Sequence, residues 1–420
     1  KLPRTGDSLM IRPPLPPHAN PDAALLTCCE EAEERVLELT ERLVNMDSGT
    51  DDLPGLERKA HVLADIFRSL GANSVELREA PEPRRGTYNV VAVFKGTGRA
   101  RVLMLTHYDT VFPAGEAARR PFRREGDMAY GPGVADMQSS IALLIAAVEI
   151  LHNKLGQRNY DTLTIHCNAD EETGSYGSRA LIRELGRSHH VSYNMEQSGR
   201  EGELITISGR GIAKGTLAVT GIASHAGGGP EKGRNAGYEL AHQLLQLRDL
   251  SRPEIRTGVH WTMGSFGHKL NVIPDHAEAF ADIRVTRVDE FDRIRATIEE
   301  RIKNRLIPDC RVEFDMDISV LPFQNDPVTL SLAEKVVAFT ERELGRRLGF
   351  RHANGGNDTS HCAQVCPSLD GFGLGCLDNH SPNEALPLAT IVPRLYILLR
   401  TWQETFAGRM LNLGEQDSPR

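Results

Sequence analysis

Apolar positions recur along the first half of the chain at helical and strand spacings that alternate with one another. Helical periodicity predicts helices at residues 30–45, 55–70, 139–155 and 177–185. Runs of β-branched and apolar residues predict strands at residues 88–94, 101–105 and 162–167. Strands that alternate with helices are typical of α/β domains, so we expect a mixed, mostly parallel sheet flanked by helices.

The pattern changes after Gly209-Arg210-Gly211. The next elements are predicted as strand 213–219, helix 235–247, strands 260–266 and 277–285, helix 288–302 and strand 310–318. This β-α-β-β-α-β order is that of a ferredoxin-like α+β domain. After it come helix 328–344, strand 367–374 and helix 388–406.

The length of 420 residues favours two domains over one core. We therefore predict a catalytic domain at residues 26–210 and 323–420 and an inserted domain at residues 211–322. Residues 1–25 contain Pro13, Pro14, Pro16 and Pro17 and are predicted to form a flexible N-terminal arm.

Composition narrows the class of protein. Hydrophobic residues make up 40% and charged residues 25%, which is ordinary for a globular protein, and the net charge is -8. Without a Lys/Arg run, a nucleic-acid partner is not expected. We find no apolar run that approaches the roughly 20 residues needed to span a bilayer, so no membrane partner is expected either.

The seven cysteines are an odd number, scattered and without a Cys-x-x-Cys pair. This favours a reducing compartment, and we expect a cytoplasmic protein; a signal upstream of Lys1 is the alternative that the sequence leaves open. Cys362 and Cys366 have i, i+4 spacing, which we interpret as buried helix thiols.

Two histidines and three carboxylates form a candidate metal-ligand set: His107, Asp136, Glu172, Glu196 and His380. This set suits a pair of zinc ions that share one bridging carboxylate. His107, Glu172 and His380 each follow a predicted strand, and ligands in open α/β sheets bind at the carboxyl ends of the strands.

Each residue also has a simpler interpretation. In His107-x-Asp109 the carboxylate could orient a metal-bound imidazole, or it could be solvated at a strand end. Asp136 follows a Gly-Pro-Gly turn and could be a helix N-cap. The carboxylates of Asp170-Glu171-Glu172 would repel one another unless a cation neutralised them, with one binding metal and one moving protons; alternatively they form an exposed acidic turn.

His225 lies in a glycine-rich run within the predicted insertion. The run is not a phosphate loop, because no Lys-Ser/Thr follows at the required spacing. A flexible loop that carries one histidine is the simpler interpretation.

Taken together, the motifs resemble those of the zinc aminoacylase, acetylornithine deacetylase, succinyl-diaminopimelate desuccinylase and glutamate carboxypeptidase family, from about residue 30 to residue 400. In chain order the shared motifs are His107-x-Asp109, Gly131-x-Gly133-x-x-Asp136, Asp170-Glu171-Glu172-x-Gly174-Ser175, Glu196, Ser224-His225-Ala226, Asn271-Val272-Ile273-Pro274, Asp282-Ile283-Arg284 and His380-Ser381-Pro382-Asn383-Glu384. Residues 121–127 and 223–227 are most similar to the glutamate carboxypeptidase branch.

The resemblance implies two Zn²⁺ per subunit, with Co²⁺ or Mn²⁺ as alternatives. One metal would take His107, Asp136 and Glu196, and the other Asp136, Glu172 and His380. It also implies that Asp109 orients His107 and that Glu171 is the general base that activates a metal-bridging water. Finally, it implies a lid or dimerisation role for the inserted domain, His225 as oxyanion stabiliser in a homodimer, and Asn271 and Arg284 as contacts of a substrate carboxylate.

Two departures from the family affect the expected substrate. After the bridging Asp the family usually has Lys or Met followed by Gly-Gly, whereas this chain has Met137-Gln138-Ser139-Ser140. The carboxypeptidase branch has an arginine for the substrate α-carboxylate near the end of the insertion, where this chain has residues 318–322, Ile-Ser-Val-Leu-Pro.

We therefore expect a di-zinc metallopeptidase that cleaves an amide bond of a small carboxylate-bearing substrate, as a carboxypeptidase or dipeptidase that releases an amino acid such as glutamate. An N-acyl-amino-acid deacylase of the aminoacylase or acetylornithine deacetylase type is the first alternative. A non-hydrolytic relative that forms amide bonds or acts as a binding scaffold is the second. A serine hydrolase is disfavoured because no Gly-x-Ser-x-Gly motif occurs.

Overall fold

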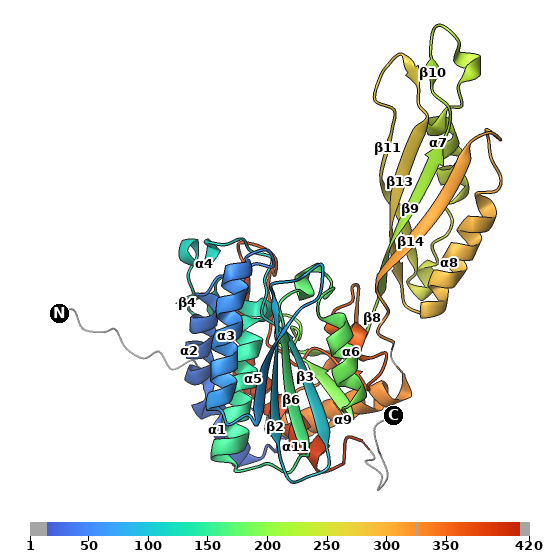
Figure 1. The fold of residues 1–420 in the computed structure, drawn as a ribbon. Helices are drawn as coiled ribbons and strands as arrows, with labels where there is room; N and C mark the ends of the chain where they lie inside the picture. The colour runs from blue at the N-terminus through green and yellow to red at the C-terminus, as the bar shows by residue number, and fades with distance from the viewer. Residues whose placement is uncertain (1–14, 325, 412–420) are drawn as a thin grey trace. The chain divides into compact units, whose positions relative to one another are not determined.

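The computed structural model describes residues 15–324 and 326–411, and the chain forms two compact units (Figure 1). Residues 208–324 and 352–360 form the second unit, and the other described residues form the first. The second unit thus contains the predicted insertion at 211–322, but it also takes residues 352–360, which the sequence had placed in the catalytic domain. Residues 1–14 of the predicted N-terminal arm lie outside the described residues.

The first unit is built on a mixed six-stranded sheet of order β1-β2-β6-β3-β7-β16. Its strands are β1 (Ser74–Glu79), β2 (Tyr88–Lys95), β3 (Arg101–His107), β6 (Thr162–Asn168), β7 (Val191–Asn194) and β16 (Ser368–Leu369). The four strands from β6 to β16 are parallel to one another, whereas β1 and β2 pair antiparallel. The predicted fold class, a mostly parallel mixed sheet, is confirmed.

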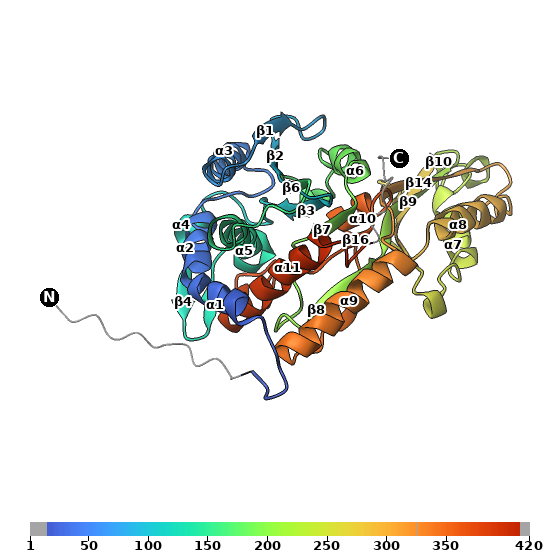
Figure 2. The ribbon, with the colours of Figure 1, turned by 90° about the horizontal axis from the view of Figure 1, so that it is seen from below.

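Helices cover both faces of this sheet. The larger core contains residues of α1 (Ala23–Glu31), α2 (Glu33–Val44), α3 (Leu53–Ser69), α5 (Ser139–Glu149), α9 (Pro327–Leu344) and α11 (Ile391–Phe406). Figure 2 shows α9 and α11 side by side beneath the sheet. On the other face, α6 (Arg179–Arg187) packs with Cys362 and Cys366 against Leu103 and Leu105 of β3. The alternation of apolar side chains along β3 thus fills both cores.

One expectation about apolar runs was wrong. Residues Val134–Lys154, which include α5, are long and apolar enough to cross a membrane by length and composition. However, 94% of the most apolar window is buried inside the protein. Its apolar character is that of a core helix, because α5 contacts both α2 and α11.

The second unit is an antiparallel four-stranded sheet of order β11-β13-β9-β14. Its strands are β9 (Gly211–Thr220), β11 (Gly258–Phe266), β13 (His276–Val285) and β14 (Arg311–Val320). Helices α7 (Ala236–Gln246) and α8 (Val288–Arg301) pack on one face, where alternate residues of β9 and β13 are buried. A small ribbon of β10 (Ser224–His225) and β12 (Val272–Ile273) completes this β-α-β-β-α-β arrangement.

The remaining elements are short. They are α4 (Glu116–Arg119), the three-stranded sheet of β4 (Arg123–Glu125), β5 (Met128–Tyr130) and β17 (Ala385–Pro387), the pair β8 (Leu204–Gly209) and β15 (Gly349–Ala353), and α10 (Asp358–Cys362). The chain passes from one unit to the other within β8, β15 and α10.

Two predicted elements differ from the structure. The strand expected at residues 367–374 is only Ser368–Leu369, because Gly371 has a φ of 81° and turns the chain out of the sheet. The helix expected at residues 388–406 begins with a 3-10 turn, and its α-helical part starts at Ile391. The seven cysteines all lie in the described residues and form no disulfides, and Cys362 and Cys366 are buried as expected.

Candidate metal centre

The carboxyl ends of three parallel strands bring the first candidate ligands together. His107 is the last residue of β3, Glu171 and Glu172 begin a 3-10 turn three residues after β6, and Glu196 comes two residues after β7. Since β6, β3 and β7 are adjacent and parallel, their carboxyl ends lie at one edge of the sheet. The strand periodicity alone therefore positions these side chains near one another.

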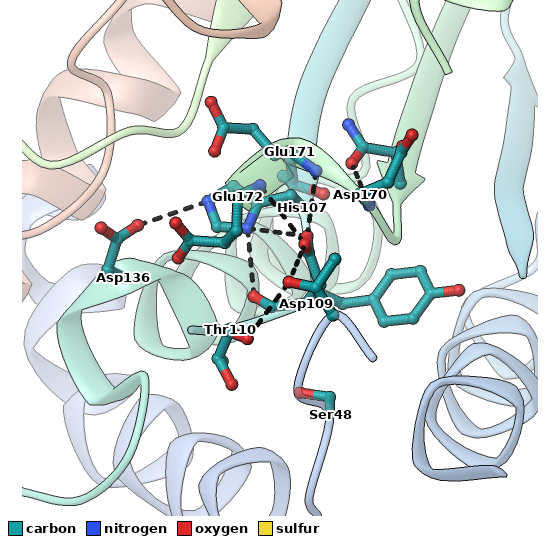
Figure 3. Close-up of polar contacts among 12 residues, drawn as sticks. Ser48, His107, Asp109, Thr110, Asp136, Asp170, Glu171 and Glu172 are labelled. Carbon is teal, nitrogen blue, oxygen red and sulfur yellow. Dashed lines mark hydrogen bonds and ion pairs between the residues drawn. The ribbon is translucent and has the colours of Figure 1, made fainter. Parts of the chain in front are cut away.

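The carboxylate of Asp109 contacts several groups at this edge of the sheet (Figure 3). Its Oδ1 lies 3.3 Å from Nδ1 of His107 and accepts the backbone N–H of Glu171 at 3.2 Å. Its Oδ2 accepts the N–H of Glu172 at 3.3 Å and the hydroxyl of Thr50 at 2.9 Å. The carboxylate thus orients the imidazole and also fixes the turn that presents the two glutamates.

Asp136 lies between the two candidate histidines. Its Oδ1 is 3.3 Å from Nε2 of His107, and its Oδ2 is 3.2 Å from Nε2 of His380. Asn379 donates a further hydrogen bond to Oδ2 at 3.2 Å. One carboxylate with an oxygen directed at each imidazole has the arrangement of a bridging ligand.

Glu172 and Glu196 occupy opposite sides of this arrangement. Nε2 of His380 lies 3.1 Å from Oε2 of Glu172, and Nε2 of His107 lies 3.6 Å from Oε1 of Glu196. Candidate ligand atoms of His107, Asp136 and Glu172 all lie within 4.8 Å of one another. The structure therefore brings all five predicted ligands together, in two overlapping groups that share Asp136.

The charges and unpartnered atoms of the five candidate ligands are better explained with bound cations than without them. Nε2 of His107 and Oε1 of Glu172 are buried without a hydrogen-bond partner. Burial raises the pKa of Glu172, and burial together with the charge of Asp136 raises the pKa of Glu196 well above its usual value. Contacts with Asp136 and Glu172 raise the pKa of His380 to about 10. Clustered carboxylates shift in this way unless a positive charge neutralises them, which divalent cations would do.

Glu171 is close to the first of these groups. Its carboxylate lies within 4.8 Å of candidate ligand atoms of His107 and Glu196, and the residue is only partly buried. Asp109 holds its backbone N–H, as described above. A carboxylate beside the ligands, rather than between the two histidines, is placed to exchange protons with a bound molecule.

Glu384 is part of a sequence motif, but no role was assigned to this residue. In the structure it is a hydrogen-bond acceptor for the backbone near Asp136. Its buried carboxylate accepts the backbone N–H groups of Gly133, Ala135 and Asp136 at 3.3, 2.8 and 3.0 Å. Burial and the nearby charge of Asp136 raise the pKa of Glu384 to about 8. Glu384 thus fixes the backbone that carries the bridging aspartate.

A buried arginine fixes the segment that carries Glu196. Arg394 of α11 donates to the carbonyl oxygens of Gly373 and Gly371, and the N–H of Gly373 donates to the carbonyl of Glu196 at 2.9 Å. A Cβ on Gly373 would approach the carbonyl oxygen of Met195 to 2.2 Å. Only glycine allows this close approach, and no sequence motif marked it.

A pocket of about 500 Å³ adjoins this edge of the first unit. Its lining comprises residues 49–52 and 110–114, Glu172 and Thr173. Small-molecule sites commonly enclose roughly 300–1,000 Å³, so the pocket has the size of a site for a small ligand.

The other predicted site residues, His225, Asn271 and Arg284, belong to the second unit, where His225 and Asn271 are neighbours and Arg284 lies apart. His225 pairs with Val272 in the β10–β12 ribbon, and Ala226 donates to the carbonyl of Asn271 at 3.0 Å, so His225 and Asn271 are neighbours. Arg284 lies on β13, eight residues along from His276, at the end that pairs with the start of β9. Eight extended residues span about 26 Å. Arg284 and the ribbon therefore lie at opposite ends of the sheet, as β10 and the start of β9 do in Figure 1.

Comparisons with known proteins agree with this geometry. The model of the family described as peptidase family M20/M25/M40 matches residues 103–404. Carboxypeptidase G2 of Pseudomonas sp. is 31% identical over 391 residues, which cover 92% of this chain and 93% of that protein. A succinyl-diaminopimelate desuccinylase of Delftia acidovorans is 26% identical and covers 88% of this chain and 98% of its own. Among solved structures, aminopeptidase PepT of Bacillus cereus has a TM-score of 0.76 at 22% identity and covers 89% of this chain and 98% of its own.

Proposed function

Because the chain belongs to peptidase family M20/M25/M40, whose members are metal-dependent hydrolases of amide bonds, we propose that it is a di-zinc enzyme that releases an amino acid such as glutamate from a small carboxylate-bearing substrate. The observation that carries this proposal is the position of Asp136, which directs one oxygen at His107 and the other at His380. A shared carboxylate between two imidazoles suits two cations rather than one.

The residues divide into two ligand sets. His107, Asp136 and Glu196 would hold one zinc, and Asp136, Glu172 and His380 would hold the other, with Co²⁺ or Mn²⁺ as alternative metals. When bound, such cations would lower the pKa of a coordinated water towards neutrality and would polarise the substrate carbonyl. Asp109 keeps His107 in position through its Nδ1 contact.

Glu171 would move the proton in this reaction. It lies beside the ligands and is only partly buried, so its carboxylate can reach a bound water. It would accept the proton of the attacking water and then donate it to the leaving amine, which separates from the acyl carbon as the amide bond breaks. His225 would donate to the oxyanion that develops on the carbonyl oxygen.

The geometry of the second unit supports a homodimer in which His225 acts on the other subunit's substrate. Arg284 and His225 are separated by more than the roughly 26 Å between Arg284 and His276, because His225 lies beyond the end of the sheet. A single small substrate cannot span that distance. If Arg284 and His225 both serve one substrate, they come from different chains.

An exposed edge of the second unit would provide the contact between copies. Strand β11 is an edge strand, and its residues Met263 and Phe266 are exposed. Tyr238 and Leu245 of α7 lie on one face of that helix, seven residues apart, and are also exposed. A long apolar edge strand pairs readily with another copy, so we infer that β11 and α7 form the dimer interface.

Three arginines of the second unit support a substrate that bears a carboxylate. Arg284 binds Asp282 and the carbonyl of Asn354, while Arg256 binds the side chain of Asn354. Arg210 is near both, because their charges lower its pKa in addition to the effect of burial, and its buried Nε has no hydrogen-bond partner. Of these three guanidinium groups, Arg284 is paired with the carboxylate of Asp282, and together the three would bind a further anion.

Two alternatives remain within reach of the same site. The missing arginine at residues 318–322 and the similarity to a desuccinylase favour an N-acyl-amino-acid deacylase of the aminoacylase type. A non-hydrolytic relative that forms amides or acts as a scaffold would keep the ligands but show no cleavage.

Metal analysis and a substrate panel test the proposal. The purified protein should contain about two zinc per chain, the number that two-metal sites hold. It should cleave one member of a panel of folyl-glutamate, N-acetyl amino acids and dipeptides, and chelation should abolish the cleavage. Preference for an N-acetyl amino acid would favour the deacylase, and bound metal without cleavage would favour the non-hydrolytic alternative. A protein that binds no divalent metal would overturn the proposal.

Substitution of Glu171 tests its role separately. Glu171→Ala should retain both metals, because Glu171 is not among the proposed ligands, and should lower kcat by at least about 100-fold, as expected for loss of general base catalysis. Glu184→Ala, an exposed glutamate of the same unit, is the control and should be unaffected. Activity near the wild-type level in Glu171→Ala would remove the proposed base.

A further inference from the structure

Lys59 is a buried lysine that the proposed mechanism does not use. It lies in α3 with 1% of its surface exposed, and its Nζ donates to Oγ of Ser48 at 2.7 Å and to Oε1 of Gln138 at 3.1 Å. Among the described residues, no carboxylate oxygen lies within 4.0 Å of this ammonium. Burial lowers the pKa of Lys59 to about 7, although the charges of Asp47 and Asp109 act to raise it. A charge that is buried at such a cost calls for a specific role.

The two acceptors of Lys59 lead to the segments that carry the metal centre. Nε2 of Gln138 donates to the carbonyl of Tyr108 at 3.1 Å, between His107 and Asp109. The carbonyl of Ser48 accepts the N–H of Thr110 at 2.9 Å, directly after Asp109. Figure 3 shows Ser48 below Thr110 and Asp109. Through Gln138 and Ser48, the ammonium of Lys59 is thus linked to Tyr108 and Thr110, the residues on either side of Asp109.

Gln138 also belongs to the turn that carries the bridging aspartate. Its N–H donates to the carbonyl of Gly133 at 3.0 Å, and it lies two residues after Asp136. Its side chain therefore joins the Asp136 turn to the end of β3 through Tyr108. A neutral amide can rotate and exchange its donor and acceptor ends, but the ammonium of Lys59 only donates and so fixes the oxygen of Gln138 towards itself.

This arrangement accounts for a departure in the sequence. The family usually has Lys or Met and two glycines after the bridging Asp, and here the run is Met137-Gln138-Ser139-Ser140. Met137 fits that pattern, and the departure is that Gln138 and Ser139 stand where the family has glycines. Unlike a glycine, Gln138 has a side chain, and this side chain contacts both Lys59 and the carbonyl of Tyr108.

We propose that Lys59 is a positioning residue of the metal centre: its ammonium orients Gln138 and Ser48, and these two residues hold the backbone on either side of Asp109 and the turn after Asp136. Lys59 touches neither a ligand nor the substrate. It acts through Asp109 and Asp136, so its loss should loosen both the first metal site and the orientation of His107. This inference rests on the proposed function, because both of its readouts, zinc affinity and turnover, require the proposed metal centre.

Substitution of Lys59 by a residue with a neutral side chain of similar length tests the proposal. Lys59→Met should fold, because it removes a buried charge and keeps the apolar stem. Its affinity for Zn²⁺, measured by competition with a chelating dye, should fall by about 10-fold. This is the lower end of the effect of removing a direct partner of a ligand, because Lys59 acts through intervening residues. With the best substrate of the panel, kcat should fall at saturating zinc, whereas KM should change little.

A swap variant separates positioning from packing. Lys59→Gln combined with Gln138→Lys places the ammonium on the other side of the same contact, and it should recover most of the lost zinc affinity. Lys335→Met is the control, since Lys335 is an exposed lysine of the same unit that donates to the carbonyl of Met410 at 2.8 Å, away from the metal centre. If Lys59→Met does not fold, Gln138→Met breaks the same link from the other end and should show the same loss of affinity.

The outcomes are distinct from those that test the function. If Lys59→Met and Gln138→Met both bind zinc and turn over as the wild type does, the positioning role is wrong while the di-zinc enzyme stands. If the wild type itself binds no zinc, the proposed function fails first. A swap variant no better than Lys59→Met would also contradict the proposal, because the ammonium would then not act through Gln138.

Discussion

At the scale of single residues, the centre depends on carboxylates with different tasks. Asp136 is directed at two imidazoles, Asp109 at one imidazole and two backbone N–H groups, and Glu384 at three backbone N–H groups. Glu171 lies beside candidate ligand atoms of His107 and Glu196 and is only partly buried, so it is placed to exchange protons with a bound molecule. The environment of each acid, rather than its type, assigns its task.

Glu384 provides a prediction at this scale. Glu384→Ala leaves the buried N–H groups of Gly133, Ala135 and Asp136 without their acceptor, and the backbone of the bridging aspartate should shift. We expect the affinity for Zn²⁺ to fall by about 10- to 100-fold. Dye competition measures it. Glu384→Gln keeps one oxygen acceptor and should lie between the alanine variant and the wild type; equal affinities for all three would contradict the role.

The five proposed ligands could be selected from the sequence because their motifs together resemble those of a known family, and the structure brings their side chains together. Lys59, Glu384 and Arg394 could not be selected in this way, since they act on backbone groups far away in the sequence. Lys59 and Gln138 are 79 positions apart, and Gly133 and Glu384 are 251 apart. A single sequence shows residue types and local spacing, but it does not show which distant carbonyl or N–H a buried charge will meet.

At the scale of elements, the long periodic segments were predictable and the short buried ones were not. The strands β2, β3 and β6 and most long helices agree with their apolar patterns. Strand β7 has four residues, all buried, and so shows no alternation, although it carries Glu196 to the centre. A loop replaces most of the strand predicted at residues 367–374, because two glycines there, Gly371 and Gly373, allow close backbone contacts.

A buried carboxylate between two helices supports a prediction about pH. Glu343 of α9 accepts from Arg400 at 2.8 Å and from Tyr396 at 2.7 Å, both on α11. Burial alone would raise the pKa of Glu343, but these hydrogen bonds lower it below its usual value. A lowered pKa in the folded state means that the contribution is present above the unfolded pKa and is lost as the pH falls.

Glu343→Gln should therefore lower the free energy of unfolding of the metal-free protein by about 2 kcal/mol at pH 7, a typical contribution of hydrogen bonds to a charged group. The difference from the wild type should shrink as the pH falls below the ordinary range of glutamate. Denaturant unfolding at pH 7 and at pH 4 measures both values. Glu341→Gln, an exposed position on the same helix, is the control. A difference that does not depend on pH would show that packing, not ionisation, is involved.

At the scale of the whole molecule, one chain carries all the proposed ligands and the base in its first unit, and His225 and Arg284 at opposite ends of its second. An enzyme that needs all of these residues for one small substrate has to combine two chains. In the proposed dimer, the exposed apolar residues of β11 and α7 would form the contact between the two chains. If so, catalysis depends on the oligomeric state, because a complete site would need residues from two chains.

Mixing two inactive variants answers that question. In a dimer of Glu171→Ala with His225→Ala, one site lacks both groups, whereas the other has Glu171 from its own chain and His225 from the partner subunit. Co-expression with random pairing should therefore restore about one quarter of the wild-type activity, since half of the twofold dimers are mixed and each has one intact site. Each variant alone should be inactive, and adding Phe266→Lys to both chains should abolish the recovery by disrupting the β11 edge. If His225 acted within its own chain, no pairing of these variants could produce an intact site, and the mixture would stay inactive however well it dimerised.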